Sequence, residues 1–541
     1  MSKNLLIHNN NVLNIKGYDQ SIEFTTIKNS LTMIKERNPE IVYIKDSLTQ
    51  NYMEFVGLLL AYHIRLTNEL EHTRFVTIVI ISDLDGFTLN KITPQAQILF
   101  TKNTFLNNLP SKYIKLNSDN FKHDFLDKTI IEQPKDMSGD HDISNQWSIY
   151  RWAEFLNVNS ESTYENKSRV ENILYFKYLK SKYRINETYQ DIQESKIIKP
   201  VNKKSGLKIV SKVTKKEQKV LYIDDQWNNG WKDIFANFFQ TKLNNEFKVI
   251  EEINKNTTFI ELKKLVINYI FSYRPDLIIL DLRILQEDFL KEKKDSDISG
   301  VKLLRYIKEE LNPGIQIILL TASGKSTILN EANKYNILGY IKKEHPHDIS
   351  INTRETFEQL KQLIDIGLTK IYLKDIWELQ HDTLSLPIIN KKEYNKIKIE
   401  IESIFEILNS DMKNRFIYAI FAIFKVLEII IEFYITESKY SGKIIAFWKN
   451  TESKVPYVTS DNFIKKTTNS DSNSRTENKI RVILHERLNL KDRVLHDKIS
   501  SLVELRNHTI HPGKKEIVLN EDKIITWFNM MNIILREINK R

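Results

Sequence analysis

The sequence predicts a multidomain protein: two α/β domains, each built on a doubly wound parallel sheet, joined by a helical spacer and followed by an all-α helical bundle. Three observations lead to this fold class. The chain has 541 residues, which is too long for one hydrophobic core. Short apolar runs alternate with longer amphipathic stretches in two separate regions, as in parallel sheets covered by helices. The last third of the chain carries almost only helical periodicity.

The first α/β domain is expected at residues 1–130. Its apolar runs NLLI, EIVYI, FVTIVII and AQILF predict buried strands separated by helices. Residues 131–198 have apolar residues at helical spacing and predict the spacer. Trp147 and Arg151 lie one helical turn apart on it and predict a packing patch against a neighbouring domain. Residues 199–217 are rich in Lys and predict a solvated linker.

The second α/β domain is expected at residues 218–354 and begins with the strand KVLYIDD. Further strands are predicted at DLIILD, IQIILLTAS and GYIKK. Residues 355–541 read as long helices, interrupted by a polar loop at 465–478. They form the predicted all-α bundle.

The composition favours a cytoplasmic protein. The chain has no Cys, which excludes disulfides and thiolate metal sites and agrees with a reducing compartment. No signal peptide is visible at the N-terminus. The most apolar segment, Phe416–Ile435, carries Lys425, Glu428 and Glu432 at helical spacing, which predicts a buried helix with a polar stripe and no membrane contact. The net charge of +10 permits a polyanionic partner.

Three carboxylates follow two predicted strands of the second α/β domain. Asp224 and Asp225 end the strand VLYIDD, and Asp281 ends DLIILD. Ligand sites in open α/β sheets lie at this carboxyl edge. Three acids so close repel one another unless a hard cation lies between them. An oxygen-only set of this kind suits Mg²⁺.

A hydroxyl and an ammonium group are predicted at the same edge. Thr321 ends the next strand, and Lys343 ends the last one. Together they suit a phosphoryl group carried on Asp281. This order and spacing resembles the flavodoxin-like receiver domain of two-component response regulators, over about residues 218–350.

The resemblance implies a role for each matching residue. Asp224 and Asp225 would help to hold Mg²⁺. Asp281 would accept the phosphoryl group, Thr321 would follow a phosphoryl oxygen, and Lys343 would pair with it. A sensor histidine kinase or another phosphodonor is the implied partner.

One further position fits this resemblance, and two features depart from it. Tyr340 falls where the family carries its aromatic switch. The segment between Asp281 and Gly300 is longer and more charged than the usual loop, so it is a candidate lid over the site. Glu344 replaces the Pro that the family carries after its Lys.

The N-terminal domain looks like a receiver without its acids. NPEIVYIKD resembles RPDLIILDL, with Lys45 in place of Asp281. Residues 8–10 are His-Asn-Asn where an acidic pair is expected, and QILFTK resembles the last strand with Lys102 at its end. Two interpretations stay open. One is a degenerate receiver, and the other is a Rossmann-like sensing domain whose Lys45 and Lys102 contact a nucleotide phosphate.

A second candidate site lies near the C-terminus, at RNHTIHPG. Asn507 and His511 share a helix face with Arg506 beside them, and Pro512 predicts that the helix ends near Ile510. RNA cleavage by the 2′-hydroxyl needs a proton acceptor and a proton donor, roles that suit His. A guanidinium stabilises the charge of the transition state. The same pattern also suits a plain exposed helix end.

An all-α domain with RN followed by His after four residues, then Pro, resembles the HEPN superfamily, over about residues 370–541. Many members are metal-independent ribonucleases that act as dimers, and others are binding modules. The resemblance implies that Arg506 and His511 form the active pair and that Asn507 is their polar neighbour, whereas His508 does not match. Glu428 or Lys425 is a candidate accessory residue.

These interpretations combine into one functional hypothesis. The chain is expected to be a signal-gated, metal-independent endoribonuclease in which a phosphorylated receiver controls a homodimeric HEPN site, with RNA as substrate and a role in stress or phage defence. The alternative is a non-catalytic phosphosignalling adaptor whose helical bundle binds a protein. No helix-turn-helix signature is apparent in the C-terminal segment, so specific DNA binding is not expected.

Overall fold

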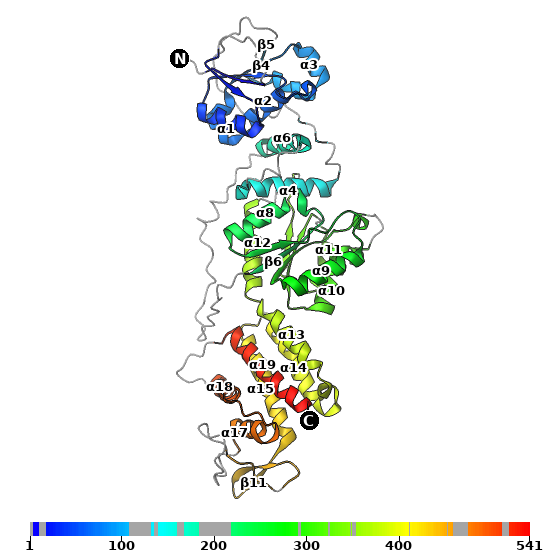
Figure 1. Cartoon of the computed structure of the whole chain (residues 1–541), viewed down its shortest axis with the longest axis vertical. Helices are drawn as coiled ribbons and strands as arrows, with labels where there is room; N and C mark the ends of the chain where they lie inside the picture. Colours follow the sequence, from blue (N-terminus) through cyan, green and yellow to red (C-terminus); the bar gives the residue numbers. More distant parts are fainter. Residues whose placement is uncertain are drawn as a thin grey trace. The chain divides into compact units, whose positions relative to one another are not determined.

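The computed structural model describes fifteen stretches of the chain: residues 4–9, 18–107, 131, 133–134, 139–158, 167–182, 218–289, 294–322, 325–346, 348, 353–410, 412–451, 453–457, 474–510 and 519–540. The predicted linker at 199–217, and His511 and Pro512, lie outside these residues. The chain, drawn in Figure 1 with colours that follow the sequence, divides into two compact units. The first comprises 1–194, 229–234 and 343–356, and the second comprises 195–228, 235–342 and 357–541.

The first unit is built on a parallel sheet with the strand order β2-β1-β3-β4-β5. Its strands are β1 (Asn4–His8), β2 (Gln20–Glu23), β3 (Ile41–Lys45), β4 (Thr77–Ile81) and β5 (Thr104–Asn107). The central strands are continuous apolar runs because both sheet faces are covered. The predicted strand AQILF is wrong. It lies in a 3-10 helix, Pro94–Phe100, because Pro94 fits the first helical turn but cannot donate to a sheet.

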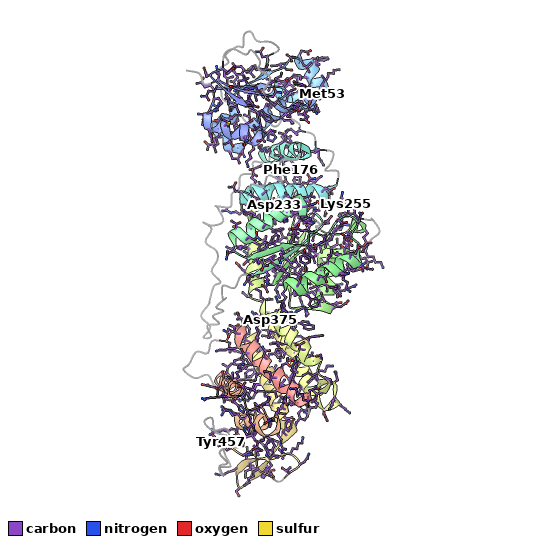
Figure 2. All side chains as sticks on the ribbon, in the orientation of Figure 1. Met53, Phe176, Asp233, Lys255, Asp375 and Tyr457 are labelled. Carbon is purple, nitrogen blue, oxygen red and sulfur yellow. The ribbon has the colours of Figure 1, made fainter. Side chains whose placement is uncertain are left out.

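In the described part of the first unit, this sheet is accompanied by the helices α1 (Ile27–Arg37), α2 (Val56–Leu66), α3 (Gly86–Ile92), α4 (Asp140–Leu156) and α6 (Lys167–Lys182). The two spacer helices, α4 and α6, share the hydrophobic core of the sheet domain. Phe176 of α6, labelled in Figure 2, packs edge-on against Trp147 of α4 with ring centroids 5.4 Å apart. The Arg151 guanidinium lies 5.8 Å from the Trp147 ring. The spacer is therefore part of the N-terminal module.

The second unit contains another parallel sheet, with the order β10-β9-β8-β6-β7. Counted from the first strand of each sheet, this is the same 2-1-3-4-5 order as in the first unit. The strands are β6 (Lys219–Ile223), β7 (Glu246–Val249), β8 (Leu277–Asp281), β9 (Gln316–Thr321) and β10 (Gly339–Lys342). Helices lie on both sides of this sheet (Figure 1): α9 (Phe259–Tyr273), α10 (Ser299–Tyr306), α11 (Ser326–Asn333) and α12 (Thr353–Leu368). Helix α8 (Trp231–Ala236) follows β6 along the chain. The fold class of two parallel-sheet α/β domains is confirmed.

The C-terminal region is rich in helices: α13 (Tyr372–Leu384), α14 (Asn395–Asn409), α15 (Arg415–Tyr434), α17 (Thr476–Val482), α18 (Arg493–Ile510) and α19 (Glu521–Asn539). The sequence predicted an all-α bundle, and this prediction is wrong because the region also contains two strands. An antiparallel hairpin of β11 (Ile435–Tyr440) and β12 (Lys443–Trp448) follows α15. Ser441 and Gly442 form its two-residue turn, and both have positive φ, as hairpin turns of this length favour.

The apolar helix α15 lies in the hydrophobic core of this region. Lys425 and Glu428 form an ion pair of 3.4 Å at its partly exposed edge. Among the described residues, no helix is long and apolar enough to cross a membrane.

Helix α13 is joined to the amino edge of the second sheet. Lys374 Nζ donates to Asp276 Oδ1 at 2.8 Å, and Asp276 immediately precedes β8. Asn312 Nδ2 donates to the Lys374 carbonyl at 3.1 Å. A Cβ on Gly314 would lie 2.4 Å from the Leu373 carbonyl oxygen, so only glycine permits this approach. The helical region is thus attached at the sheet edge opposite the predicted acidic site.

Candidate functional site

The structure brings the three predicted carboxylates of the second sheet together. Strands β6 and β8 are adjacent and parallel, with Ile223 opposite Leu280, so Asp224 lies opposite Asp281. One carboxylate oxygen from each of Asp224, Asp225 and Asp281 lies within 4.8 Å of the others. Asp224 and Asp281 are buried, and Asp225 is half-buried. Close packing of adjacent parallel strands therefore concentrates three acids at the carboxyl edge.

Hydrogen bonds hold Asp224 in place. Tyr222 Oη donates to Asp224 Oδ2 at 2.5 Å, and the backbone N–H of Gln226 donates to Oδ1 at 2.7 Å. Burial raises the pKa of Tyr222 well above its ordinary value, and the nearby carboxylates, Asp224 first, raise it further. Tyr222 therefore stays protonated and remains a donor to Asp224 at neutral pH. Sequence reasoning missed Tyr222, although its position two residues before Asp224 places both side chains on one face of the strand.

The donor set fits Mg²⁺. All three side chains offer carboxylate oxygens, which are the ligands that hard cations prefer. Their ligand atoms are close enough to contact one ion. A cation there would also offset the mutual repulsion of three negative charges in a largely buried site.

The two other predicted phosphosite residues lie at the carboxyl ends of the neighbouring strands: Thr321 is the last residue of β9, and Lys343 follows β10. Asp281 pairs with Leu320, and Thr321 is the next residue of β9. Lys343 directly follows β10, whose Lys342 pairs with Thr321. The Lys343 side chain is fully buried, and its ammonium group lies 5.3 Å from the centre of the Trp231 ring. Both residues are therefore placed at the carboxyl edge.

Tyr340 lies within β10 and is 37% exposed. Its ring is therefore accessible to solvent on the last strand of the sheet. Its partner in the ladder is Leu319 of β9.

Glu344, which replaces the usual Pro, is held by several polar contacts within the first unit. Its carboxylate accepts from Trp152 Nε1 at 2.8 Å and from Thr353 Oγ1 at 3.0 Å. Its carbonyl accepts from Ser148 Oγ at 3.2 Å. Trp152 and Ser148 belong to α4, so the spacer helix contacts the residue next to Lys343. The sequence gives no sign of the two contacts with α4, because 196 and 192 residues separate the partners.

The long segment after Asp281 is anchored at both ends by Asp288, which is 3% exposed. Its carboxylate accepts from the backbone N–H groups of Ile284 and Leu285 at 3.1 and 3.0 Å. It also accepts from the backbone N–H of Ser299 at 2.9 Å and from the Ser299 hydroxyl. The described part of the predicted lid is thus a hydrogen-bonded loop beside the site.

Gly300 sets the approach of helix α10 to the site. A Cβ at this position would lie 2.4 Å from the Asp281 carbonyl oxygen. We expect Gly300→Ala to lower the free energy of unfolding by about 2 kcal/mol, because backbone atoms must move to relieve the overlap. Urea unfolding followed by circular dichroism measures this change.

Gly86→Ala is the matched control for this substitution. The nearest heavy atom to a Cβ on Gly86 is Leu106 Cδ2 at 3.5 Å, an ordinary contact. We expect a change within about 0.5 kcal/mol, or a small stabilisation from the reduced freedom of the unfolded chain. Equal losses in the two variants would contradict a steric role for Gly300.

The corresponding edge of the first sheet has a different set of side chains. β1 ends at His8, with Asn9 next, and β3 ends at Lys45. The prediction for Lys102 is wrong: this exposed residue lies in the turn before β5, at the opposite end of the strand from the carboxyl edge. Lys45 and Lys102 therefore do not share the edge that a common phosphate site requires.

The C-terminal candidate site is described only in part. Arg506 is half-buried on α18, with its guanidinium 5.0 Å from the Phe424 ring of α15. Arg506 Nη1 donates to Asn507 Oδ1, its neighbour in the sequence, at 3.2 Å. His511 lies outside the described residues. Glu428 lies one helical turn after Phe424 on α15.

Comparison with known proteins identifies the N-terminal domain. Residues 4–107 match the family of inactive receiver domains. This match confirms the interpretation as a degenerate receiver, in preference to a Rossmann-like sensing domain. No curated protein matches the chain.

Solved structures similar to the chain include several receivers. A signal receiver domain from Vibrio parahaemolyticus is 20% identical, with a TM-score of 0.21, over 30% of this chain and 97% of that one. A two-component response regulator from Clostridium difficile is 18% identical, with a TM-score of 0.19, over 28% and 97%. A signal receiver domain of a diguanylate cyclase from Desulfovibrio desulfuricans is 16% identical, with a TM-score of 0.20, over 29% and 98%.

Proposed function

We propose that the second α/β domain is a receiver that accepts a phosphoryl group on Asp281, and that this modification controls RNA cleavage by the C-terminal helical region. One observation carries the proposal: Asp281 ends a central strand within 4.8 Å of two further carboxylates. The inactive receiver at the N-terminus supports it, since its sheet has the same strand order. The chain thus pairs an inactive receiver with a sheet that retains the acids.

The phosphoryl transfer uses the residues of the carboxyl edge. A carboxylate oxygen of Asp281 attacks the phosphorus of an acyl phosphate or a phosphohistidine, and the bond from phosphorus to the donor breaks. The electron pair leaves with the donor, which is released as a carboxylate or an imidazole. Lys343 and Thr321 provide a cation and a hydroxyl for the phosphoryl oxygens. Mg²⁺, bound by the three carboxylates, would offset the charge of the incoming group.

The RNA cleavage that we propose uses Arg506 and His511. The 2′-oxygen attacks the adjacent phosphorus and loses its proton to a base, while the bond to the 5′-oxygen breaks and that oxygen takes a proton from an acid. The products are a 2′,3′-cyclic phosphate and a 5′-hydroxyl. Arg506, positioned against Phe424, supplies a fixed positive charge for the phosphate. Two copies of the chain would supply two His511 side chains, one for each proton transfer.

Control by phosphorylation can be measured directly. The full chain is incubated with acetyl phosphate and Mg²⁺, transferred into chelator and mixed with total RNA. We expect the cleavage rate to change by at least about fivefold relative to untreated protein, the range of ordinary coupling between sites. Asp281→Asn is expected to show no response to the same treatment.

Other outcomes separate the two functions. An unchanged rate in protein that carries the phosphoryl group would contradict gating. Intact RNA in both states would instead support the adaptor, in which the helical region binds a protein.

A further inference from the structure

The first unit contains a large cavity between the inactive receiver and the spacer helices. Its volume is about 1170 Å³, and α1, α2, α4 and α6 all contribute to its lining. Met53, labelled in Figure 2, lies at this cavity. The volume is sufficient for a small organic molecule.

The cavity wall includes a buried histidine whose ring nitrogens have no hydrogen-bond partner among the described residues. His63 of α2 is 2% exposed and lines the cavity. Neither its Nδ1 nor its Nε2 forms a hydrogen bond with any described residue. Burial lowers the pKa of His63, and the nearby charge of Lys177 lowers it further, so the ring is neutral at pH 7. A neutral imidazole buried in this way retains one donor and one acceptor for a ligand.

Lys177 of α6 places a positive charge at the same wall. Its ammonium group donates to Thr67 Oγ1 at 2.8 Å. Burial lowers the pKa of Lys177 to about 8, so most copies are still charged at pH 7. A desolvated ammonium group gains more from an anion than an exposed one does.

The remaining wall is mixed, and most of its acids are already engaged. Glu54 accepts from Thr49 Oγ1 at 3.0 Å and from Asn51 Nδ2 at 3.2 Å. Glu154 accepts a hydrogen bond from Lys180. Glu69 is exposed and acts on Lys177 through its charge alone. Apolar side chains surround these groups: Leu31, Val56, Leu59, Leu70, Tyr150 and Ile173.

We propose that this cavity binds a small organic anion whose apolar body packs on the aliphatic wall and whose charged group contacts Lys177 and His63. Such a ligand would provide a hydrogen-bond partner for the His63 imidazole and would offset the buried positive charge of Lys177. The site lies wholly in the N-terminal module, so it does not depend on the proposed phosphoryl transfer or RNA cleavage. It makes the inactive receiver a ligand sensor.

A pair of fluorescent probes tests this proposal on the full chain. The anionic probe is 8-anilinonaphthalene-1-sulfonate, and the uncharged probe is N-phenyl-1-naphthylamine, which has a similar aromatic body. We expect Lys177→Met to weaken binding of the anionic probe about tenfold and to leave the uncharged probe within about twofold, because a charge-assisted contact is lost. His63→Leu should weaken the anionic probe about fivefold.

Lys182→Met is the matched control. Lys182 is exposed on the same helix and does not line the cavity. It should change neither probe by more than about twofold, since exposed charges contribute little. The proposal would be overturned if neither Lys177→Met nor His63→Leu changed the affinity for the anionic probe. Equal weakening of both probes, or no saturable binding to the parent chain, would overturn it as well.

Discussion

Replacing Asp281 with Asn is expected to reduce phosphoryl labelling of the chain by at least about 100-fold, because the amide lacks the anionic oxygen that attacks phosphorus. Full-length protein is incubated with radiolabelled acetyl phosphate and Mg²⁺, and the protein-bound label is counted. Labelling should also disappear in chelator, because three adjacent carboxylates repel an incoming phosphate unless a cation is bound. Asp281→Asn keeps the size of the side chain, so the loss is not expected to reflect misfolding.

Asp295→Asn is the control for this substitution. Asp295 begins a short 3-10 helix, Asp295–Asp297, in the segment after Asp281, and it does not belong to the acidic cluster. It should be labelled to the same extent as the parent chain. Label that persists in Asp281→Asn at the parent level would contradict the assignment of the acceptor.

The acidic cluster was predictable from sequence for a simple geometric reason. Parallel strands end at a common edge, so acids that terminate neighbouring strands come together whatever the helices between them do. Asp224 and Asp281 follow this rule through the direct pairing of β6 with β8. The same reasoning places Thr321 and Lys343, because β9 and β10 extend the same ladder.

The last strand of the first sheet was predicted at the wrong place, because apolar content alone was used to locate it. AQILF is as apolar as a buried strand, but Pro94 favours a helical turn, and the true strand, Thr104–Asn107, has less regular apolar content. The error moved Lys102 from one end of a strand to the other. Short apolar runs do not distinguish a strand from a buried helical turn.

The contacts of the spacer helices could not be predicted because they join residues that are distant in sequence. Glu344 reads as a plain departure from a family pattern, yet its carboxylate accepts a hydrogen bond from Trp152 of α4, 192 residues away in the sequence. His63 is one of two polar side chains, with Arg65, on an otherwise apolar helix, and the sequence does not show that its ring nitrogens form no hydrogen bond with any described residue. Tertiary packing, which local pattern does not encode, decides both cases.

The position of α13 constrains how the phosphorylation that we propose would reach the helical region. Lys374 contacts the amino edge of the sheet, whereas the acidic cluster lies at the carboxyl edge. A change at Asp281 must therefore pass through the packed sheet and its helices, or alter an exposed surface such as that around Tyr340.

Substitution of Arg506 by Ala is expected to reduce metal-free cleavage of RNA by about 100- to 1000-fold, because the transition-state phosphate loses a fixed positive charge. His511→Ala should cause a loss of similar size, since proton transfer loses its donor or acceptor. Cleavage of total RNA by the full chain is measured in chelator. A 2′,3′-cyclic phosphate on the products would identify the 2′-oxygen as the nucleophile.

The matched control for both substitutions is Arg493→Ala, at the first residue of the same helix. The Arg493 side chain is 78% exposed and pairs only loosely with Asp497, at 3.9 Å. We expect cleavage within about twofold of the parent rate, because an exposed ion pair contributes little. Arg506→Lys keeps the positive charge but removes the planar guanidinium. If its cleavage rate lies between those of Arg506→Ala and the parent chain, the shape of the guanidinium contributes as well as its charge. Cleavage that survives in Arg506→Ala and His511→Ala would contradict this site, whereas RNA left intact by the parent chain would favour the adaptor.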